Sequence, residues 1–253
     1  MGQIKATIRR CFNMVGVDIR RTKNVPTITM LGLPLWPVRT IVDVGANQGQ
    51  FIRKVRPLFP AAAIYCYEPL PSACKELQKL VETYRNIHIR QLALGESAGT
   101  AMFNEHIKHS PSSSLLSITP ELRKLFPQTI NQKPVEVRVS TLDLQFPEPN
   151  KLEPDVLLKL DVQGYEDRVL RGGAHFLRSV DIVIVECSVV PLYEGQASFI
   201  SICKEMSTAG LSYTGNLDQT YDEHGRVIFL DAVFLRKGLD RFDPKKGSHK
   251  DAC

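Results

Sequence analysis

The stretch that decides the fold is IVDVGANQGQF, residues 41–51. It begins as an apolar run typical of a buried strand, and Gly45 and Gly49 follow where the chain must turn. Beyond Gly49, apolar residues recur at helical spacing. Glycine lets a ligand approach the backbone closely, and the start of a helix offers free N–H groups. The stretch therefore predicts a strand, a ligand-binding turn and a helix.

Two acidic residues indicate which kind of ligand this turn binds. The spacing between Gly45 and Gly49 is G-x-x-x-G, without the third glycine of the dinucleotide pattern. Asp43 precedes the turn, and a carboxylate there is unfavourable beside phosphates but favourable beside the cationic amino acid part of S-adenosylmethionine. Glu68 ends the next apolar run, residues 63–69, roughly 20 residues past the turn, where a carboxylate can accept both ribose hydroxyls. The pair indicates a nucleoside site.

Strand and helix patterns alternate along much of the chain. Apolar runs at 40–46, 63–69, 87–94, 155–162 and 181–187 predict buried strands. Helices are expected between them, one of them capped at its N-terminus by Ser72 and another from about Ser198 to Thr208. Two further strands are expected at 211–216 and 227–235. This alternation predicts an α/β fold with a doubly wound, mostly parallel seven-stranded sheet, whose ligands bind at the carboxyl ends of the strands.

Residues 95–154 interrupt the alternation. Short strand patterns at 100–107 and 135–144 flank a serine- and proline-rich segment, HSPSSSLLSITP, at 109–120. We expect a β-hairpin-like insertion that carries a mobile loop between the third and fourth strands of the sheet. Three regions follow: an N-terminal amphipathic helix and connector (1–39), one domain containing the insertion (40–238), and a polar tail expected to be disordered (239–253).

Composition sets limits on the partners and the compartment. The net charge of +5 is too small to imply a nucleic acid partner. The six cysteines lie far apart without metal-ligand spacing, which favours reduced thiols and a cytoplasmic location. No apolar run approaches the roughly 18 residues of a membrane span, and the N-terminus lacks the pattern of a signal peptide. The oligomeric state stays open, a homo-oligomer included.

Several blocks in order resemble one family. They are DVGANQGQF, YCYEPLPSACKEL, ALGESAGTAMFN, VRVSTLDL, LLKLDVQGYEDRVLRGG and IVIVECSVVPLYEG, which together extend from about residue 41 to 234. The sequence resembles the FkbM-type S-adenosylmethionine-dependent methyltransferases. The resemblance implies a class I methyltransferase fold, with methyl transfer to a hydroxyl oxygen of a sugar, glycan or secondary metabolite.

The resemblance also implies which residues hold the cofactor. The methionine part would be surrounded by Asp43, Gly45, Ala46, Asn47 and Gly49. Glu68 would hold the ribose, and Pro69 and Leu70 would flank the adenine. Ala93 and Ser114 are further candidates for the adenine end.

The catalytic base is less defined by the pattern. Lys159 and Asp161 share one face of the fourth strand by alternation, and Glu186 ends the fifth. A hydroxyl needs a base or a metal to become a nucleophile, so Asp161, Glu186 and His106 are the candidate catalytic residues. Asp161 and Glu186 could also bind a divalent cation, and their hard oxygen ligands would suit Mg²⁺. The sequence does not decide whether a metal is used.

Two other classes stay open from the sequence. One is a nicotinamide-dependent oxidoreductase on a similar sheet, which the missing third glycine opposes. The other is a non-catalytic binding protein that retains the fold. A nucleic-acid methyltransferase is disfavoured because the chain has no Asn/Asp-Pro-Pro-aromatic motif and no separate basic domain.

Overall fold

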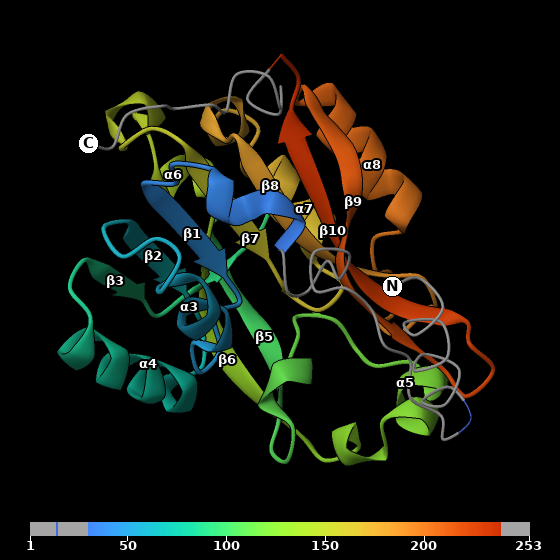
Figure 1. The fold of residues 1–253 in the computed structure, drawn as a ribbon. Coiled ribbons are helices and arrows are strands. Elements are labelled where there is room, and N and C mark those ends of the chain that lie inside the picture. The colour runs from blue at the N-terminus through green and yellow to red at the C-terminus, as the bar shows by residue number, and fades with distance from the viewer. Residues whose placement is uncertain (1–13, 15–29, 239–253) are drawn as a thin grey trace.

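The computed structural model describes Met14 and residues 30–238. The predicted N-terminal helix and the predicted disordered tail lie outside the described residues. Within them, the largest unit is a seven-stranded sheet in the order β3-β2-β1-β7-β8-β10-β9 (Figure 1). Its strands are β1 (Thr40–Val44), β2 (Ala63–Tyr67), β3 (Ile87–Arg90), β7 (Val156–Leu160), β8 (Ile182–Ser188), β9 (Leu211–Tyr221) and β10 (Val227–Arg236).

All pairs among β1, β2, β3, β7 and β8 are parallel, whereas β10 runs antiparallel to both of its neighbours. The mostly parallel seven-stranded sheet expected from the sequence is confirmed. Every residue of β1 and β7 is buried, which explains why these strands read as continuous apolar runs rather than alternating ones. β1 lies between β2 and β7, so the strand order reverses beside it.

Helices cover both faces of this sheet, and each face has its own apolar core. One core joins the sheet to η2 (Met30–Leu35), α3 (Gln50–Val55) and α4 (Pro71–Thr83). The other joins it to α7 (Glu166–Arg171), η6 (Phe176–Ser179) and α8 (Phe199–Thr208). The helix expected from about Ser198 to Thr208 is present as α8, and the Ser198 side chain caps it by accepting a hydrogen bond from the Ser201 N–H. The cap predicted at Ser72 is wrong: α4 begins at Pro71, whose fixed φ suits a first helical position.

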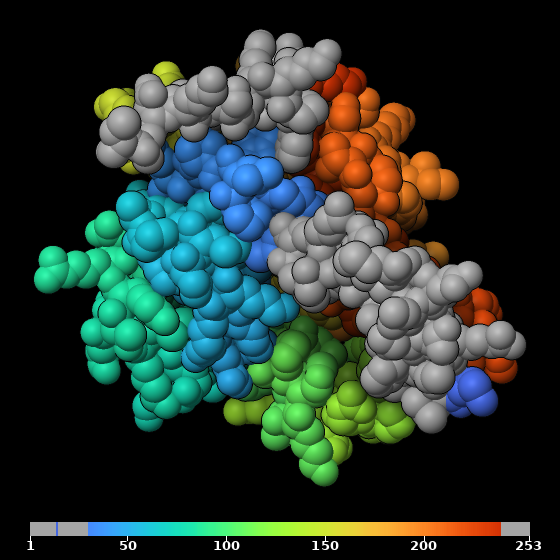
Figure 2. Space-filling view, viewed as in Figure 1, coloured from blue at the N-terminus to red at the C-terminus, as the bar shows by residue number. Residues whose placement is uncertain are grey.

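The insertion forms a second, three-stranded sheet in the order β4-β6-β5, from β4 (Ala93–Leu94), β5 (Gly99–His106) and β6 (Gln132–Ser140). β5 and β6 pair antiparallel, as the expected hairpin requires. Between them lie η3 (Ser110–Ser112), α5 (Pro120–Leu125) and η4 (Pro127–Thr129); α6 (Leu142–Gln145) and η5 (Pro149–Lys151) follow. In Figure 2 the green insertion lies against the blue and cyan first half of the domain.

Two expectations for this region need correction. The run 87–94 is not one strand, because the chain leaves the main sheet after Arg90 and Ala93–Leu94 pair with β6 instead. The serine-rich segment was expected to be a mobile loop, yet Ser112, Ser113 and Ser114 are buried. The Ser113 hydroxyl accepts from the His106 N–H and the Ser114 hydroxyl donates to the Gln163 carbonyl, so the segment is packed against the domain.

None of the helices within the described residues has both the length and the apolar character needed to cross a bilayer. Cys66, Cys74, Cys187 and Cys203 are free thiols, the first three of them buried.

Candidate functional site

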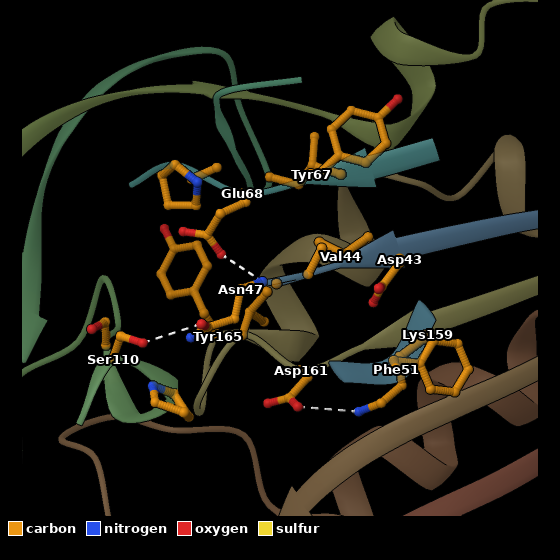
Figure 3. A pocket seen from close by; sticks show the side chains of 18 of the residues that line it. Asp43, Val44, Asn47, Phe51, Tyr67, Glu68, Ser110, Lys159, Asp161 and Tyr165 are labelled. Carbon is orange, nitrogen blue, oxygen red and sulfur yellow. Dashed lines mark hydrogen bonds and ion pairs between the residues drawn. The ribbon is translucent and has the colours of Figure 1, made fainter. Parts of the chain in front are cut away.

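A cavity of about 240 Å³ opens at the carboxyl ends of β1, β2 and β7, where the strand order reverses. This is the edge at which open α/β sheets bind ligands. The main sheet supplies Asp43, Glu68, Lys159 and Asp161 to its wall, and Figure 3 shows Glu68 and Tyr165 on one side with Lys159 and Asp161 on the other. The insertion covers it with Phe103, Ser110, Pro111, Ser113 and Leu115.

The glycine turn is fixed between the ends of two neighbouring strands. Gly45 has a φ of 80°, and its N–H and that of Ala46 donate to the Tyr67 carbonyl at 2.9 and 3.2 Å. A Cβ at Gly45 would lie 1.9 Å from the carbonyl oxygen of Asp161. The turn therefore needs glycine for its backbone angle and for the closeness of the segment after β7.

Glu68 is held by backbone donors on both of its oxygens. Its Oε2 accepts from the Asn47 N–H and its Oε1 from the Leu70 N–H, each at 2.9 Å. Burial raises the pKa of this carboxyl to about 7, although the two backbone hydrogen bonds counteract the rise. Because a carboxylate oxygen can accept twice, each oxygen keeps a lone pair for a ligand hydroxyl.

Asp43 is the most unusual group in the cavity wall. It is 1% exposed, and its Oδ2 has no hydrogen-bond partner among the described residues. Burial raises its pKa to about 7, and the nearby positive charge of Lys159 limits that rise. A buried acceptor without a partner is costly, so this oxygen marks a place for a donor or a cation from a ligand.

Lys159 lies between two carboxylates. Its Nζ is 3.4 Å from Asp161 Oδ2 and 3.4 Å from Asp231 Oδ1. Burial alone would lower the pKa of Lys159, but Asp161, Asp231 and Glu186 together raise it above its usual range. The lysine therefore stays charged. The alternation argument places Asp161 beside it, whereas Asp231 comes from the distant β10 and no local sequence signal marks it.

The side-chain amide of Gln163 lies between Glu186 and Asp161 and bridges them. The Nε2 of Gln163 donates to Asp161 Oδ1 at 2.7 Å and to Glu186 Oε1 at 2.5 Å. Burial, and to a lesser extent the charge of Asp161, raises the pKa of Glu186 well above its ordinary value.

No group of three histidine, cysteine or acidic side chains within Met14 and 30–238 could hold a metal ion. This donor set does not fit the Mg²⁺ considered from the sequence.

The structure separates the remaining sequence-predicted site residues into two groups. Ala46, Asn47, Pro69 and Ala93 line the cavity together with the acids described above. The residues that do not line it are Gly49, Leu70, Ser114, His106 and Glu186.

Three of these have another contact in the structure. Gly49 packs against α4, where an added Cβ would lie 2.4 Å from a Leu80 methyl carbon. Ser114 donates to the Gln163 carbonyl at 2.8 Å, so Ser113 takes the cavity position expected of its neighbour. His106 is 1% exposed, and its Nε2 lies 3.3 Å from Gln132 Nε2. The structure gives a catalytic role of His106 no support.

Several cavity residues have no counterpart among the sequence predictions. They are Val44, Gln50, Phe51, Tyr67, Leu94, Phe103, Ser110, Pro111, Ser113, Leu115 and Val162. Ser110 closes the cavity from the insertion side, since its hydroxyl donates to Asn47 Oδ1 at 3.1 Å. Tyr165, which stands directly after the pattern LDVQG, lines the cavity as well. The serine-rich pattern could indicate that a segment of the insertion lies near Glu68. It could not indicate which of the serines line the cavity.

The sheet order and the cavity at its reversal point define the class I methyltransferase architecture. The sequence model of the methyltransferase FkbM domain matches residues 43–222. The chain belongs to the FkbM methyltransferase family, which confirms the resemblance seen in its motifs.

Known relatives give context at low identity. The chain is 27% identical over 166 residues to the 2-O-methyltransferase NoeI of Sinorhizobium fredii, covering 63% of this chain and 68% of that protein. It is 28% identical over 155 residues to the methyltransferase sdnD of Sordaria araneosa, covering 52% and 59%. Less than two thirds of sdnD is therefore spanned. The solved structure of a methyltransferase FkbM from Methylobacillus flagellatus is similar with a TM-score of 0.46 and 12% identity, covering 79% of this chain and 44% of that one.

Proposed function

We propose that this chain transfers a methyl group from S-adenosylmethionine to a hydroxyl oxygen of a sugar, glycan or secondary metabolite. One observation carries the proposal: two buried acids, Asp43 in β1 and Glu68 directly after the neighbouring parallel β2, line one cavity beside a glycine turn. A dinucleotide site needs room for phosphates at that turn, which the buried carboxyl of Asp43 disfavours. The nicotinamide-dependent alternative is therefore the weaker one.

The residues of the cavity fit each part of the cofactor. The unpartnered Oδ2 of Asp43 suits the cationic amino acid end. Glu68 keeps lone pairs for the two ribose hydroxyls, because its present partners are single N–H groups. Phe103, Leu115 and Ala93 provide an apolar wall for the adenine. These contacts support the methionine and ribose parts of the S-adenosylmethionine site predicted from the sequence. For the adenine end we propose Phe103 and Leu115 of the insertion beside Ala93, in place of Leu70 and Ser114.

Methyl transfer requires this chain to orient the acceptor hydroxyl and to remove its proton. The cofactor would supply a methyl carbon whose bond to sulfur breaks as the bond to the acceptor oxygen forms. Asp161 lines the cavity and is the group best placed to accept the proton of that hydroxyl. The Lys159 Nζ lies 3.4 Å from Asp161 Oδ2 and forms an ion pair with it. Fixing the acceptor oxygen in line with the methyl carbon supplies much of the remaining rate enhancement.

The acceptor class rests on the relatives. NoeI is named a 2-O-methyltransferase, which supports oxygen rather than nitrogen or carbon as the methylated atom. A binding protein that has kept the fold without turnover is the second candidate, and only an acceptor screen separates the two. The location in the cytoplasm stays a proposal that rests on the unpaired thiols.

The test is calorimetric titration with S-adenosylhomocysteine of the wild type and of Glu68→Ala, with NAD as control ligand. We expect saturable binding to the wild type, and at least about a 100-fold loss in the variant, because two ligand hydroxyls lose a charged acceptor. Glu194→Ala, an exposed acid outside the cavity, is the matched control and should bind like the wild type. Binding of NAD alone, or no binding of either ligand, would overturn the proposal. An acceptor screen with radiolabelled S-adenosylmethionine follows.

A further inference from the structure

Building on the proposed methyl transfer, we propose that Gln163 fills the place of a divalent cation between Asp161 and Glu186 and orients Asp161 toward the acceptor hydroxyl. Gln163 is a positioning residue in this proposal, since it acts through Asp161. Methyl transfer by this chain would then need no divalent metal.

The first argument is the space that the amide occupies. Its nitrogen lies 2.7 Å from Asp161 Oδ1 and 2.5 Å from Glu186 Oε1. A Mg²⁺ ion shared by these two carboxylates would need to lie about 2.1 Å from an oxygen of each. It would therefore have to displace the amide. The two hydrogens of the amide nitrogen instead satisfy one oxygen of each carboxylate.

The second argument is that the amide oxygen is bound as well. The Tyr193 hydroxyl is 2.7 Å from Gln163 Oε1 and 2.9 Å from the Ser112 carbonyl oxygen, and its single hydrogen donates to one of these acceptors at a time. Tyr193 thus lies at the oxygen end of the amide, whose nitrogen faces Asp161 and Glu186. Tyr193 is 1% exposed, so water cannot easily take over its role.

The third argument is that the backbone is held in an uncommon conformation to deliver this side chain. Gln163 has a φ of 57°, a region that a residue with a Cβ seldom adopts. Its carbonyl accepts from the Ser114 hydroxyl at 2.8 Å. On either side, the N–H groups of Val162 and Gly164 donate to Glu166 Oε1 at 3.1 Å. Buried side chains thus hold the strained residue from three directions.

The result is a carboxylate with both oxygens fixed. Asp161 Oδ1 accepts from Gln163, and Asp161 Oδ2 faces Lys159 at 3.4 Å. Its plane is set from two sides, which leaves the remaining lone pairs for a ligand in the cavity that Asp161 lines. Gln163 itself does not line that cavity, so changes at Gln163 should affect turnover more than cofactor binding.

The first experiment measures metal binding and cofactor binding in the same samples. Mn²⁺ is titrated into wild type and Gln163→Glu in the presence of S-adenosylhomocysteine, and free Mn²⁺ is followed by electron paramagnetic resonance. We expect no saturable binding to the wild type. In Gln163→Glu a third carboxylate joins Asp161 and Glu186, so one Mn²⁺ should bind there and Mg²⁺ should compete for the same site.

Binding of one Mn²⁺ per wild-type chain, and its loss in Glu186→Gln, would overturn the inference. Failure of S-adenosylhomocysteine to bind would count against the proposed function instead, while the Mn²⁺ result would still decide this one.

The second experiment tests orientation. Tyr193→Phe keeps the buried ring and removes only the hydroxyl, and Gln163→Leu removes the amide. With the acceptor from the screen, we expect kcat to fall about 10-fold or more in Gln163→Leu, which removes a hydrogen bond to the Asp161 carboxylate, and about 3-fold or more in Tyr193→Phe, which removes a neutral hydrogen bond to the amide. KM for S-adenosylmethionine should be unchanged in both. The pH profile of kcat should shift in Gln163→Leu because the environment of the base has changed. A wild-type kcat and pH profile in both folded variants, as judged by their melting temperatures, would contradict the positioning role.

Discussion

At the scale of single residues, the site is built from buried carboxyl groups whose charge is costly. Burial raises the pKa of Asp43, Glu68 and Glu166 to about 7 in each case. Glu166 uses its charge within the protein, by accepting two backbone hydrogen bonds. Asp43 has an oxygen with no such partner. The cavity is therefore charged at a free-energy cost that a cationic ligand can offset.

We predict that affinity for S-adenosylmethionine falls as the pH drops below about 7, because Asp43 then becomes neutral and loses its attraction for the cationic end. Titrations at pH 6 and pH 8 measure this. Asp43→Asn should bind weakly at both values, with a smaller difference between them. An affinity of the wild type that is equal at the two pH values would contradict the role given to Asp43.

The same acids should make the ligand-free protein less stable at higher pH. In the unfolded chain they ionise near pH 4, whereas Asp43 and Glu68 ionise near 7 when folded. Between these values the folded chain binds more protons, so stability declines as the pH rises from about 4 to about 7. Urea unfolding at pH 5.5 and pH 8 tests the sign. Asp43→Asn, which carries no charge, should be the more stable protein at pH 8 by on the order of 1–2 kcal/mol.

At the scale of elements, the turn after β1 and the segment after β7 are closely packed against each other. The limiting contact is Gly45, whose α-carbon has no room for a side chain facing Asp161. Gly225, in the hairpin between β9 and β10, has the same φ of 80° but nothing within 4 Å of an added Cβ. Substitution of the two glycines by alanine therefore distinguishes the cost of backbone strain from the cost of a steric clash.

We predict that Gly45→Ala and Gly225→Ala both lose about 1 kcal/mol of stability for the left-handed backbone, and that Gly45→Ala loses at least about 2 kcal/mol more for the clash. Gly45→Ala should also lose S-adenosylhomocysteine binding, which Gly225→Ala should keep. Urea unfolding and calorimetry measure the two effects. Equal stability loss in the two variants would show that the turn can relax away from Asp161.

The elements and the acids of the main sheet were predictable because their signals are local. The glycine turn, Glu68, and the pairing of Lys159 with Asp161 each follow from spacing within one strand or turn. The cover of the cavity was not predictable, because it depends on how the insertion folds back. A shift of one residue exchanges Ser113 for Ser114, and His106 is directed into the insertion's own core rather than the cavity. Asp231 and Tyr193 are contacts at long range, which no local pattern encodes.

At the scale of the whole molecule, the cavity lies between the main sheet and the smaller sheet of the insertion. The main sheet supplies the acids, and the insertion supplies Phe103, Ser110 and Leu115. The hydrogen bond from Ser110 to Asn47 joins the two across the opening. A bound ligand would therefore contact both sheets at once and hold the insertion against the domain.

We predict that S-adenosylhomocysteine slows amide hydrogen exchange in two distant segments together, residues 44–47 and residues 113–116, because a ligand that bridges them must leave before either can open. Mass spectrometry of the exchanged protein measures this. The hairpin tip at 222–226 does not line the cavity and serves as an internal control. Protection of 44–47 alone would show that the insertion does not take part in binding.

The ion pairs of Lys159 have a consequence for how the family can diverge. Lys159 is 5% exposed and lies between Asp161, which lines the cavity, and Asp231, which belongs to β10, the second strand from the edge of the sheet. A lineage that replaced the lysine alone would leave Asp161 and Asp231 without the ammonium group that each faces at 3.4 Å, and partly buried carboxylates without a counterion destabilise the fold. Substitutions at the three positions should therefore be inherited together. Relatives in which Lys159 has been replaced should have neutral residues at one or both of the acidic positions, so that changes in β7 and in β10 are inherited together.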